Sequence, residues 1–423
     1  MHQTNKSFDI IIIGGGAAGM MAAISAKRHN PKLSVAIIDQ TFALGRKILI
    51  SGAGRCNLTN KNLTKDLTKK YFGDKKIIES VFKQFGYKEI TEFFNGLGLE
   101  LYEETKSASG KIFPKNDQAK AVVALLISEI ERLNIESVLN TTVLSVKKDK
   151  KVFVLTGNCE NKEVVYTADK LVLAAGGKSY PALGADGSGF DLAHDFKHRI
   201  IEPVPSGVPL VGKNELSQAL QGTKLEAEIT AYINNKKADN VVGDVLFTQY
   251  GLSGSGILSV SRGFSIELNR NHKNFAEVVL NFFPDKNSLE VKKYLAVRFK
   301  KHPDQTIENN LWGIFPMKFV FTILKLSNVD PLKRVNKLKV EEIEKLINNL
   351  TACKINITGT RGWNEAEFTA GGVAAEDVDP NNLESKLVSG LYFCGEVLDV
   401  DGEIGGYNLS WAWASGFVVG ESL

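Results

Sequence analysis

The N-terminal part of the chain alternates two short apolar runs with a stretch of helical character. Phe8 to Ile13 is rich in β-branched residues and suits a strand that is buried on both faces of a sheet. We expect a helix over Met20 to Lys27, which Asn30-Pro31 would end, and a second parallel strand over Ser34 to Ile38. This order of elements predicts a βαβ unit at the start of an α/β domain.

The next part of the chain continues with helical and strand-like segments. We expect a helical region with a polar surface over Asp66 to Leu101. Apolar positions near the helical repeat predict an amphipathic helix over Ala119 to Leu133. Strand-like runs that lead back to the main sheet follow at Thr142 to Val146, Lys151 to Leu155 and Leu171 to Ala174.

The pattern changes at Pro203-Val204-Pro205. Strand-like segments at Leu225 to Ile233 and Phe275 to Phe283 are followed by Lys-rich helical ones, without a phosphate-binding turn. Glycines then return, with a last buried strand expected at Leu391 to Cys394 and a helix entered from Gly405. A segment of different character between two similar ones is typical of an inserted domain.

We therefore predict an α/β fold with a discontinuous first domain. A Rossmann-like domain of residues 1–200 and 352–423 is expected to be interrupted by an inserted, mainly β (α+β) domain of residues 201–351. The 423 residues are 43% hydrophobic and 24% charged, which is typical of globular proteins. Glycine is in excess, with 38 Gly against 11 Pro, and it lies in clusters. Clustered glycine indicates a backbone that approaches a ligand closely.

Charge and cysteine usage exclude several classes. A net charge of +4 is too small to indicate a nucleic-acid partner. The four Cys show no CxxC spacing, and His194 and His198 lack a third ligand, so we expect neither a metal nor disulfides. No apolar run approaches the roughly 18 residues of a membrane span. We expect a cytoplasmic protein without membrane contact.

The first glycine cluster has the spacing of a dinucleotide-binding turn. Gly14, Gly16 and Gly19 follow a predicted strand and open a predicted helix, and Asp39 ends the next strand. Gly14 would permit the tight turn, Gly16 the approach of a pyrophosphate, and Gly19 the packing of the helix on the strand. Asp39 would accept hydrogen bonds from ribose hydroxyls.

Later small-residue clusters indicate which dinucleotide binds. Leu171 to Gly177 is an apolar strand that runs into small residues, and glycines around Gly395 and Gly406 precede the last predicted helix. Clusters this far apart in the chain imply an elongated ligand whose distal ring lies at a second helix N-terminus, as FAD does. Within the Gly/Ser-rich loop after Asp39, Lys47 and Asn57 are candidates for contacts near the reactive flavin nitrogen.

The sequence resembles the BaiN-like, or YhiN-like, family of bacterial NAD(P)/FAD-dependent oxidoreductases, which are related to flavoproteins of the fumarate reductase and aspartate oxidase type. The resemblance covers nearly the whole chain and rests on GGGAAG at 14–19, GRKILISGAGRCNLTN at 45–60, GKIFP at 110–114, LAAGGKSYPALG at 173–184, GLSGSG at 251–256, TAGGV at 369–373 and GEVLDVDGEIGGYNLSWAWASG at 395–416. It implies non-covalent FAD and an inserted, largely β-stranded domain. Asp186 stands displaced from the acidic position that is usual in this family, so its role is left open.

The motifs and the resemblance together define a predicted site. The predicted FAD contacts are Gly14, Gly16, Ala17, Ala18, Gly19, Asp39, Gln40, Gly45, Arg46, Lys47, Ser51, Gly52, Asn57, Val143, Ala174, Ala175, Gly176, Gly395, Glu396, Asp399, Gly406, Tyr407, Asn408 and Leu409. The candidates for acid–base or substrate-binding roles are Lys111, Arg361 and Tyr407.

The expected activity is passage of a hydride through FAD from a reduced donor, with NAD(P)H as a candidate, to a small organic substrate. No second GxGxxG is present, so a nicotinamide would bind in turn at the flavin face. The alternatives are an amine oxidase that releases hydrogen peroxide, a tRNA-acting flavoprotein, and an FAD-binding protein without turnover. In Lys286 to Lys301 and Lys333 to Lys345, basic and acidic residues are interleaved, which favours solvated helix faces over a nucleic-acid surface. The oligomeric state is left open.

Overall fold

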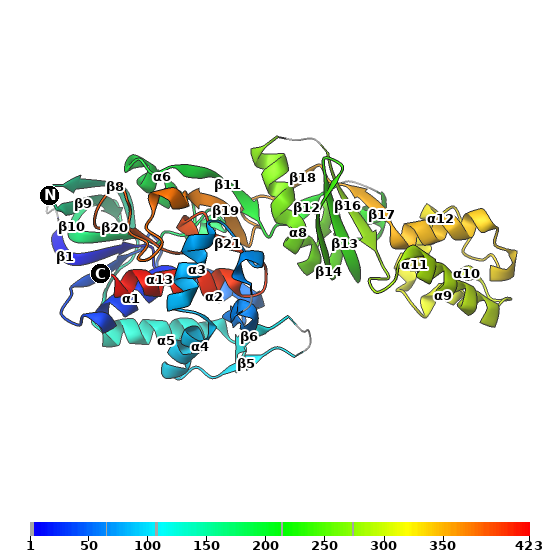
Figure 1. The fold of residues 1–423 in the computed structure, drawn as a ribbon, viewed down its shortest axis with the longest axis horizontal. Helices are drawn as coiled ribbons and strands as arrows, with labels where there is room; N and C mark the ends of the chain where they lie inside the picture. Colours follow the sequence, from blue (N-terminus) through cyan, green and yellow to red (C-terminus); the bar gives the residue numbers. More distant parts are fainter. Residues whose placement is uncertain (1–3, 65, 106–108, 213–214, 273–274) are drawn as a thin grey trace. The chain divides into compact units, whose positions relative to one another are not determined.

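A computed structural model describes residues 4–64, 66–105, 109–212, 215–272 and 275–423 of the chain (Figure 1). These residues form two compact units. The first runs up to Pro203 and resumes at Phe368, and the second runs from Val204 to Glu367. The boundaries expected from the sequence lay at 200/201 and 351/352, so the C-terminal boundary differs most. The difference arises because β17 (Cys353–Asn356) pairs with β16 (Ala276–Asn281) in the second unit.

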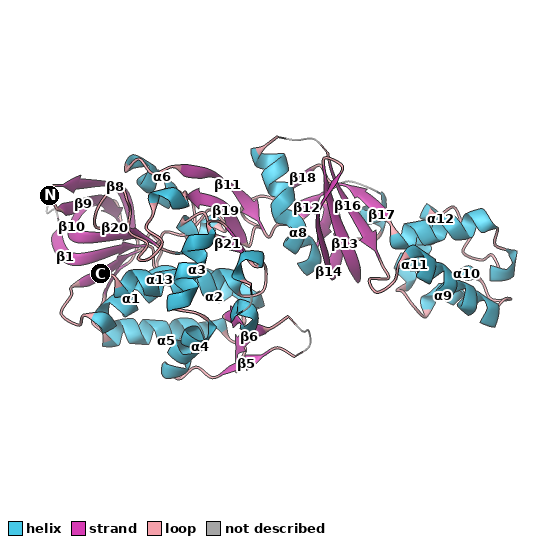
Figure 2. Ribbon diagram, viewed as in Figure 1, coloured by secondary structure: helices cyan, strands magenta, loops and turns pink. Residues whose placement is uncertain are grey.

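The first unit is built on a largely parallel sheet (Figure 2). Its parallel strands are β1 (Thr4–Ile13), β2 (Val35–Ile38), β7 (Glu136–Val138), β10 (Lys162–Leu173) and β20 (Leu391–Phe393). The hairpin β8 (Thr141–Asp149) and β9 (Val152–Cys159) joins β10 in antiparallel pairing. The central strands are buried because their apolar side chains point to both faces, with Ile10, Ile11 and Ile12 fully inaccessible to solvent. The predicted α/β fold class is confirmed.

Two helices from opposite ends of the chain pack closely in the first unit. They are α1 (Ala17–His29), which follows β1, and α13 (Tyr407–Glu421), which ends the chain. A Cβ added at Gly416 would lie 2.4 Å from the Ala18 carbonyl oxygen, so this approach requires glycine. Both termini of the sequence therefore build one core, as the glycine clusters indicated.

The region from 66 to 101 differs from the single helical stretch that we expected. It contains the short strand β4 (Tyr71–Phe72) and two helices, α3 (Lys75–Gln84) and α4 (Tyr87–Gly96). The break falls at Phe85-Gly86, where Gly86 is extended and begins α4. The expected helix from Ala119 is present as α5 (Ala119–Arg132).

Short elements complete the first unit near the glycine-rich loops. They are α2 (Arg46–Ile50), β3 (Thr59–Asn60), β5 (Leu101–Glu103), β6 (Lys111–Pro114), α6 (Ser188–Asp195), β19 (Phe368–Val373) and β21 (Asp401–Gly402). β6 lies between β3 and β5 in a small antiparallel sheet, and β21 pairs with β4. β19 pairs with β11 (Ile200–Ser206), which carries the chain into the second unit.

The second unit contains an antiparallel sheet. Its strands, in spatial order, are β17, β16, β13 (Lys224–Ile233), β14 (Lys236–Thr248), β15 (Gly251–Ser253), β12 (Leu210–Val211) and β18 (Gly359–Thr360). Helix α8 (Ser255–Ser265) packs on this sheet and continues as one π-helical turn, and α7 (Glu215–Ala219) is a short helix near β14. The sequence pattern missed β14 because its first half is polar and exposed.

Four helices follow and return the chain to β17. They are α9 (Ser288–Lys301), α10 (Ile307–Trp312), α11 (Met317–Leu326) and α12 (Val340–Thr351), and they gather at one end of the second unit (Figure 1). Their buried sides hold Leu295, Phe319 and Ile323. We call this group, residues 286–351, the helical subdomain.

Candidate active site

The turn between β1 and α1 has the geometry that the glycine spacing predicted. Gly14 has φ +106°, and a Cβ there would lie 2.4 Å from the Ala174 carbonyl oxygen. A Cβ at Gly19 would lie 1.9 Å from the Gly14 carbonyl oxygen, so only glycine lets α1 begin this close to the turn. Gly16, by contrast, faces open space, with nothing within 4 Å of an added Cβ. The backbone at Gly16 is thus accessible to a phosphate at the N-terminus of α1.

Asp39 lies directly after β2 and is held in place by the neighbouring backbone. Its Oδ2 accepts from the Gly15 N–H at 2.6 Å, and its Oδ1 accepts from the Thr41 N–H and hydroxyl, each at 2.7 Å. A carboxylate has further lone pairs beyond these bonds. Asp39 is therefore oriented beside the glycine turn and retains capacity to accept from ribose hydroxyls.

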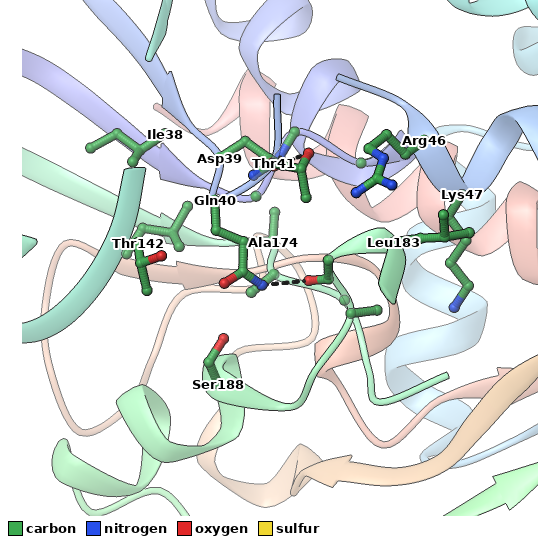
Figure 3. A pocket seen from close by; sticks show the side chains of 18 of the residues that line it. Ile38, Asp39, Gln40, Thr41, Arg46, Lys47, Thr142, Ala174, Leu183 and Ser188 are labelled. Atoms are coloured by element: carbon green, nitrogen blue, oxygen red, sulfur yellow. Dashed lines mark hydrogen bonds between the residues drawn. The ribbon is translucent and has the colours of Figure 1, made fainter. Parts of the chain in front are cut away.

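A pocket opens between the glycine turn and the chain that follows β10 (Figure 3). The predicted FAD contacts that line it are Gly14, Gly16, Asp39, Gln40, Gly45, Arg46, Lys47, Val143, Ala174, Ala175 and Gly176. Lining residues that the sequence analysis did not name include Thr41, Thr142, Leu183, Gly184, Ala185 and Ser188. These come mainly from the loop before α6, which carries no sequence signal of its own for a nucleotide.

Gln40 connects the two sides of this pocket. Its Nε2 donates to the Gly184 carbonyl oxygen at 2.9 Å and to Asp186 Oδ2 at 3.1 Å (Figure 3). Burial alone would raise the pKa of Asp186, but hydrogen bonds from Ser188 and Gln40 outweigh this and the pKa lies below its usual value. Asp186 is thus an ionised carboxylate that holds the loop 181–188 beside Gln40.

A buried ion pair lies at the Lys47 end of the pocket. The Lys47 ammonium donates to Glu396 Oε2 at 2.7 Å and also to the Ser179 hydroxyl. Glu396 Oε1 accepts from the Ser179 hydroxyl at 3.0 Å and from the Thr369 N–H at 2.7 Å. Burial raises the pKa of Glu396, but the charge and hydrogen bond of Lys47, with those of Thr369 and Ser179, outweigh it, so the pKa is lowered. The pair is ionised and each partner is fixed.

A second group of predicted contacts gathers at the N-terminus of α13. Gly406 precedes α13 with φ +97°, and a Cβ there would lie 2.9 Å from Asn57 Oδ1. This oxygen is buried and has no hydrogen-bond partner within the described residues. An unpaired buried oxygen is costly unless a ligand supplies a donor. The free amides of the first turn of α13 offer partial positive charge at the same place.

Lys111 lies beside this second group. It pairs with Asn60 across β3 and β6, and its Cε is 3.9 Å from a Cβ built at Gly405. Asn60 donates to the Gly405 carbonyl oxygen at 2.8 Å and so fixes the turn. Lys111 is half-buried and makes no hydrogen bond or ion pair with any residue that the structure describes.

Other predicted contacts have structural partners of their own. Asn408 bonds to the backbone of Gly402 through both side-chain atoms, at 2.8 and 2.9 Å. The Ser51 hydroxyl donates to the Ile48 carbonyl oxygen at 2.7 Å. Gly395 donates its N–H to the Ser415 hydroxyl at 2.9 Å. These residues shape loops around the site, and the side chain of Asn408 serves the turn before α13.

Two of the three acid–base candidates are committed elsewhere. Arg361 lies in the second unit, where its Nε is 2.6 Å from Glu365 and its guanidinium lies 4.6 Å from the ring centroid of Tyr250. Tyr407 is only 3% exposed, and burial, with the charge of Glu403, raises its pKa to about 12. Of the three, Lys111 alone combines an unpaired charge with a position at the second group.

Cysteine and metal chemistry find no site among the described residues. Burial raises the pKa of Cys56 to about 12, and the side chain is fully inaccessible. No group of three or more His, Cys, Asp or Glu residues is arranged to ligate a metal in the part of the chain that the structure describes. His198 instead bonds to the Ala193 carbonyl oxygen and the Ser385 hydroxyl. The same part of the chain has no helix that is long and apolar enough to cross a membrane.

The glycine turn, the pocket and the α13 turn recur in a known group of proteins. Residues 8–422 match the family described as HI0933-like protein Rossmann domain. The chain belongs to the HI0933-like family. The match spans nearly the whole chain, so the resemblance inferred from the motifs is confirmed.

Curated relatives of this HI0933-like chain have two different names. It is 36% identical over 411 residues to the 3-dehydro-bile acid delta(4,6)-reductase of Clostridium scindens, covering 97% of this chain and 98% of that protein. It is 33% identical over 423 residues to the ribosomal RNA dihydrouridine synthase of Escherichia coli, covering 99% and 98%. A Haemophilus influenzae protein with the same RNA-related name is 30% identical over 422 residues, covering 98% of each chain.

Solved structures share the fold of this HI0933-like chain. The 3-ketosteroid-delta4-(5alpha)-dehydrogenase of Rhodococcus jostii covers all of this chain and 97% of its own at a TM-score of 0.54 and 15% identity. The 3-ketosteroid delta1-dehydrogenase of Sterolibacterium denitrificans covers 99% of each chain at a TM-score of 0.53 and 12% identity. At these identities the likeness concerns architecture alone.

Some site residues lay beyond the sequence analysis. Ser179 and Thr369 complete the bonds around Glu396, but neither lies in a glycine-rich phosphate turn. Both fall inside blocks quoted for the family resemblance, 173–184 and 369–373, which was the available signal. Their convergence on one carboxylate depends on contacts between segments far apart in the chain.

Proposed function

We propose that this FAD-dependent oxidoreductase reduces a carbon–carbon double bond that is conjugated with a carbonyl group, with NAD(P)H as the electron donor. In the overall reaction the substrate and NAD(P)H consume one proton and yield the saturated product and NAD(P)⁺. The proposal places the enzyme in the cytoplasm, where NAD(P)H is available.

The chemistry common to the two relatives' names supports this reaction. A delta(4,6)-reductase of a 3-dehydro compound acts on double bonds in line with a 3-oxo group. A dihydrouridine synthase saturates the double bond of the uracil ring, which is conjugated with a ring carbonyl. Both reactions add a hydride and a proton across an electron-poor double bond. A single flavin site can serve either substrate.

The residues that would hold FAD carry the proposal. Gly14 and Gly16 would hold the pyrophosphate at the N-terminus of α1, and Asp39 a ribose. The unpaired Asn57 oxygen would accept a hydrogen bond from the ring system, and the amides at Gly406 would stabilise negative charge on it. When bound, FAD supplies the hydride-transfer chemistry. The buried, unpaired Asn57 oxygen beside Gly406 is the observation that supports a flavin here most directly.

The chain's own residues supply charge and position. Lys111 is a half-buried ammonium without a partner in the described part of the chain, so its charge is available to an oxygen that becomes negative during reduction. The Lys47–Glu396 pair fixes the loop that lines the pocket. No second dinucleotide turn is present in the sequence, so the nicotinamide donor would use the substrate position in turn.

Anaerobic turnover with defined acceptors tests the proposal. The purified yellow protein is mixed with NADH or NADPH without oxygen, and the flavin absorbance is followed while an acceptor is added. We expect NAD(P)H to bleach the flavin and either a 3-oxo-Δ4 steroid acid or a uridine-containing RNA to restore it. An acceptor-independent return of colour with one peroxide per donor would instead identify an oxidase. A flavin that no nicotinamide donor bleaches would contradict the proposal.

Ribosomal RNA is a second substrate candidate beside a small organic molecule. Two relatives that match over 98% or more of this chain carry an RNA-related name, which leaves open the partner that the sequence analysis did not expect. The RNA arm of the same experiment separates the two substrates, because uridine reduction yields dihydrouridine in the recovered RNA.

A further inference from the structure

The positive charge of the protein is concentrated in the helical subdomain. Between residues 286 and 345 there are thirteen Lys and Arg and seven Asp and Glu, whereas the whole chain has 52 and 48. This segment therefore has a net charge of +6, and the rest of the chain has −2. A basic segment on an otherwise nearly neutral protein is the electrostatic signature of a polyanion-binding surface.

The acidic residues of the helical subdomain mostly serve its own backbone. Glu290 accepts from the Asn287 N–H at 2.8 Å in a capping box at the start of α9. Glu342 accepts from the Lys339 N–H at 2.7 Å and pairs with Lys333 at 2.8 Å. Asp330 accepts from the Leu332 N–H at 3.0 Å. The interleaving that looked like charge balance in the sequence is therefore largely a set of caps and turns.

Many of the basic residues stay exposed and unpaired. None of the following makes a side-chain hydrogen bond or ion pair in the described part of the chain: Lys293, Lys300, Lys301, Lys325, Arg334, Lys337 and Lys345. Lys293 and Lys300 are seven residues apart on α9, so two helical turns bring them to the same face. Their charges are not neutralised by the protein itself.

Aromatic rings are exposed among these charges. Tyr294 is 38% exposed, Trp312 39% and Phe321 59%. Phe321 and Lys325 are neighbours on α11 because residues four apart lie on one helix face. A face that only serves solvation has no use for large exposed rings. Rings beside unpaired cations are what single-stranded nucleic acids require, since bases stack on the rings and phosphates contact the cations.

We propose that the helical subdomain is an RNA-docking surface that presents a uridine-containing strand to the enzyme. Lys293, Lys300 and Lys301 would contact phosphates, and Phe321 would stack on an unpaired base. This inference rests on the proposed function and narrows it, because it assigns RNA as the substrate class. It also revises the expectation of no nucleic-acid partner, which depended on the interleaved acidic residues.

Fluorescence anisotropy with a labelled, single-stranded, uridine-containing RNA tests this surface on the full-length FAD-bound protein. The variant K293E/K300E/K301E reverses three charges on α9. The variant K150E/K151E/K162E reverses three exposed charges at hairpin turns of the first unit and is the matched control. We expect the α9 variant to bind at least about tenfold more weakly, with a smaller dependence on salt, and the control to bind within about twofold of the parent protein. F321A should weaken binding by about tenfold through lost stacking.

Several outcomes would overturn the inference. The parent protein might bind no RNA at moderate salt, the two triple variants might lose affinity equally, or phosphatidylserine vesicles might bind while RNA does not. Flavin bleaching by NAD(P)H is measured on the same preparations. Normal bleaching with no RNA binding defeats only this inference, whereas α9-dependent RNA binding without bleaching defeats only the proposed function.

Discussion

Lys47 and Glu396 lie 349 positions apart in the sequence, and their ammonium and carboxylate groups meet at 2.7 Å. Their side chains are 29% and 20% exposed, so each charge depends on the other for much of its stabilisation. The bond joins the loop after the first βαβ unit to the strand end that precedes the last helix. Both segments belong to the first unit, and the bond fixes the end of the dinucleotide pocket.

Removing the cation of this pair should destabilise the protein more than removing both charges. We expect Lys47→Met to lower the free energy of unfolding by about 3 kcal/mol, because Glu396 is left buried and uncompensated. The double variant K47M/E396Q should recover about half of that loss or more. Urea denaturation followed by tryptophan fluorescence measures both. Equal losses in the single and double variants would show that the pair does not couple.

The same pair should make stability depend on acid. The pKa of Glu396 is lowered in the folded protein, so its contribution is present above the ordinary glutamate value of 4.5 and is lost as the pH falls through the folded value. We expect the free energy of unfolding to fall over this acidic range. Glu396→Gln should flatten this part of the pH profile, while Glu100→Gln, at an exposed pair on the surface, should change it little.

Two glycines of the first turn should respond differently to alanine. At Gly16 an added methyl group meets open space, so G16A should leave the stability of the apoprotein nearly unchanged while FAD binds at least about tenfold more weakly. At Gly19 the methyl group would meet the Gly14 carbonyl oxygen, so G19A should lower stability by about 2 kcal/mol. Denaturation of apoprotein and FAD titration by fluorescence quenching give the two quantities. A stability loss in G16A equal to that in G19A would contradict this view of the turn.

Asn57 should behave as a ligand-binding residue, and Asn60 as a structural one. Asn57 Oδ1 has no partner in the described protein, so Asn57→Ala should leave the apoprotein as stable or more stable while it weakens FAD binding. Asn60 donates to Gly405 and Ser109, so Asn60→Ala should lower apoprotein stability by about 1–2 kcal/mol. The same two measurements apply. Loss of apoprotein stability in N57A would indicate that the Asn57 oxygen has a protein partner.

The parts of the fold with local signals could be predicted from the sequence. The β1 strand, the glycine turn and Asp39 are fixed by short-range sterics and spacing, and they lie together as expected. The region 66–101 was less predictable, because the break at Gly86 interrupts a pattern that is otherwise continuously helical. The end of the second unit depends on the pairing of β17 with β16, which local sequence does not encode.

The candidate site was predictable to the same degree. Glycines and Asp39 have mechanical roles that a motif states, whereas Ser179 and Thr369 matter only because folding brings them to Glu396. The acidic residues of the helical subdomain show the converse case. Their number was visible in the sequence, but their use as caps at Glu290 and Glu342 required the structure.

The central claim is that a flavin at this site passes electrons from NAD(P)H to a conjugated double bond. Stopped-flow absorbance under anaerobic conditions tests it most directly, with reduction of the purified protein by NADH or NADPH followed by mixing with a 3-oxo-Δ4 steroid acid or a uridine-containing RNA. The account predicts rapid bleaching by one of the nicotinamides and reoxidation by one of the acceptors, with the saturated product recovered in equal amount. A protein that binds no FAD, or a reduced flavin that neither acceptor reoxidises, would contradict it.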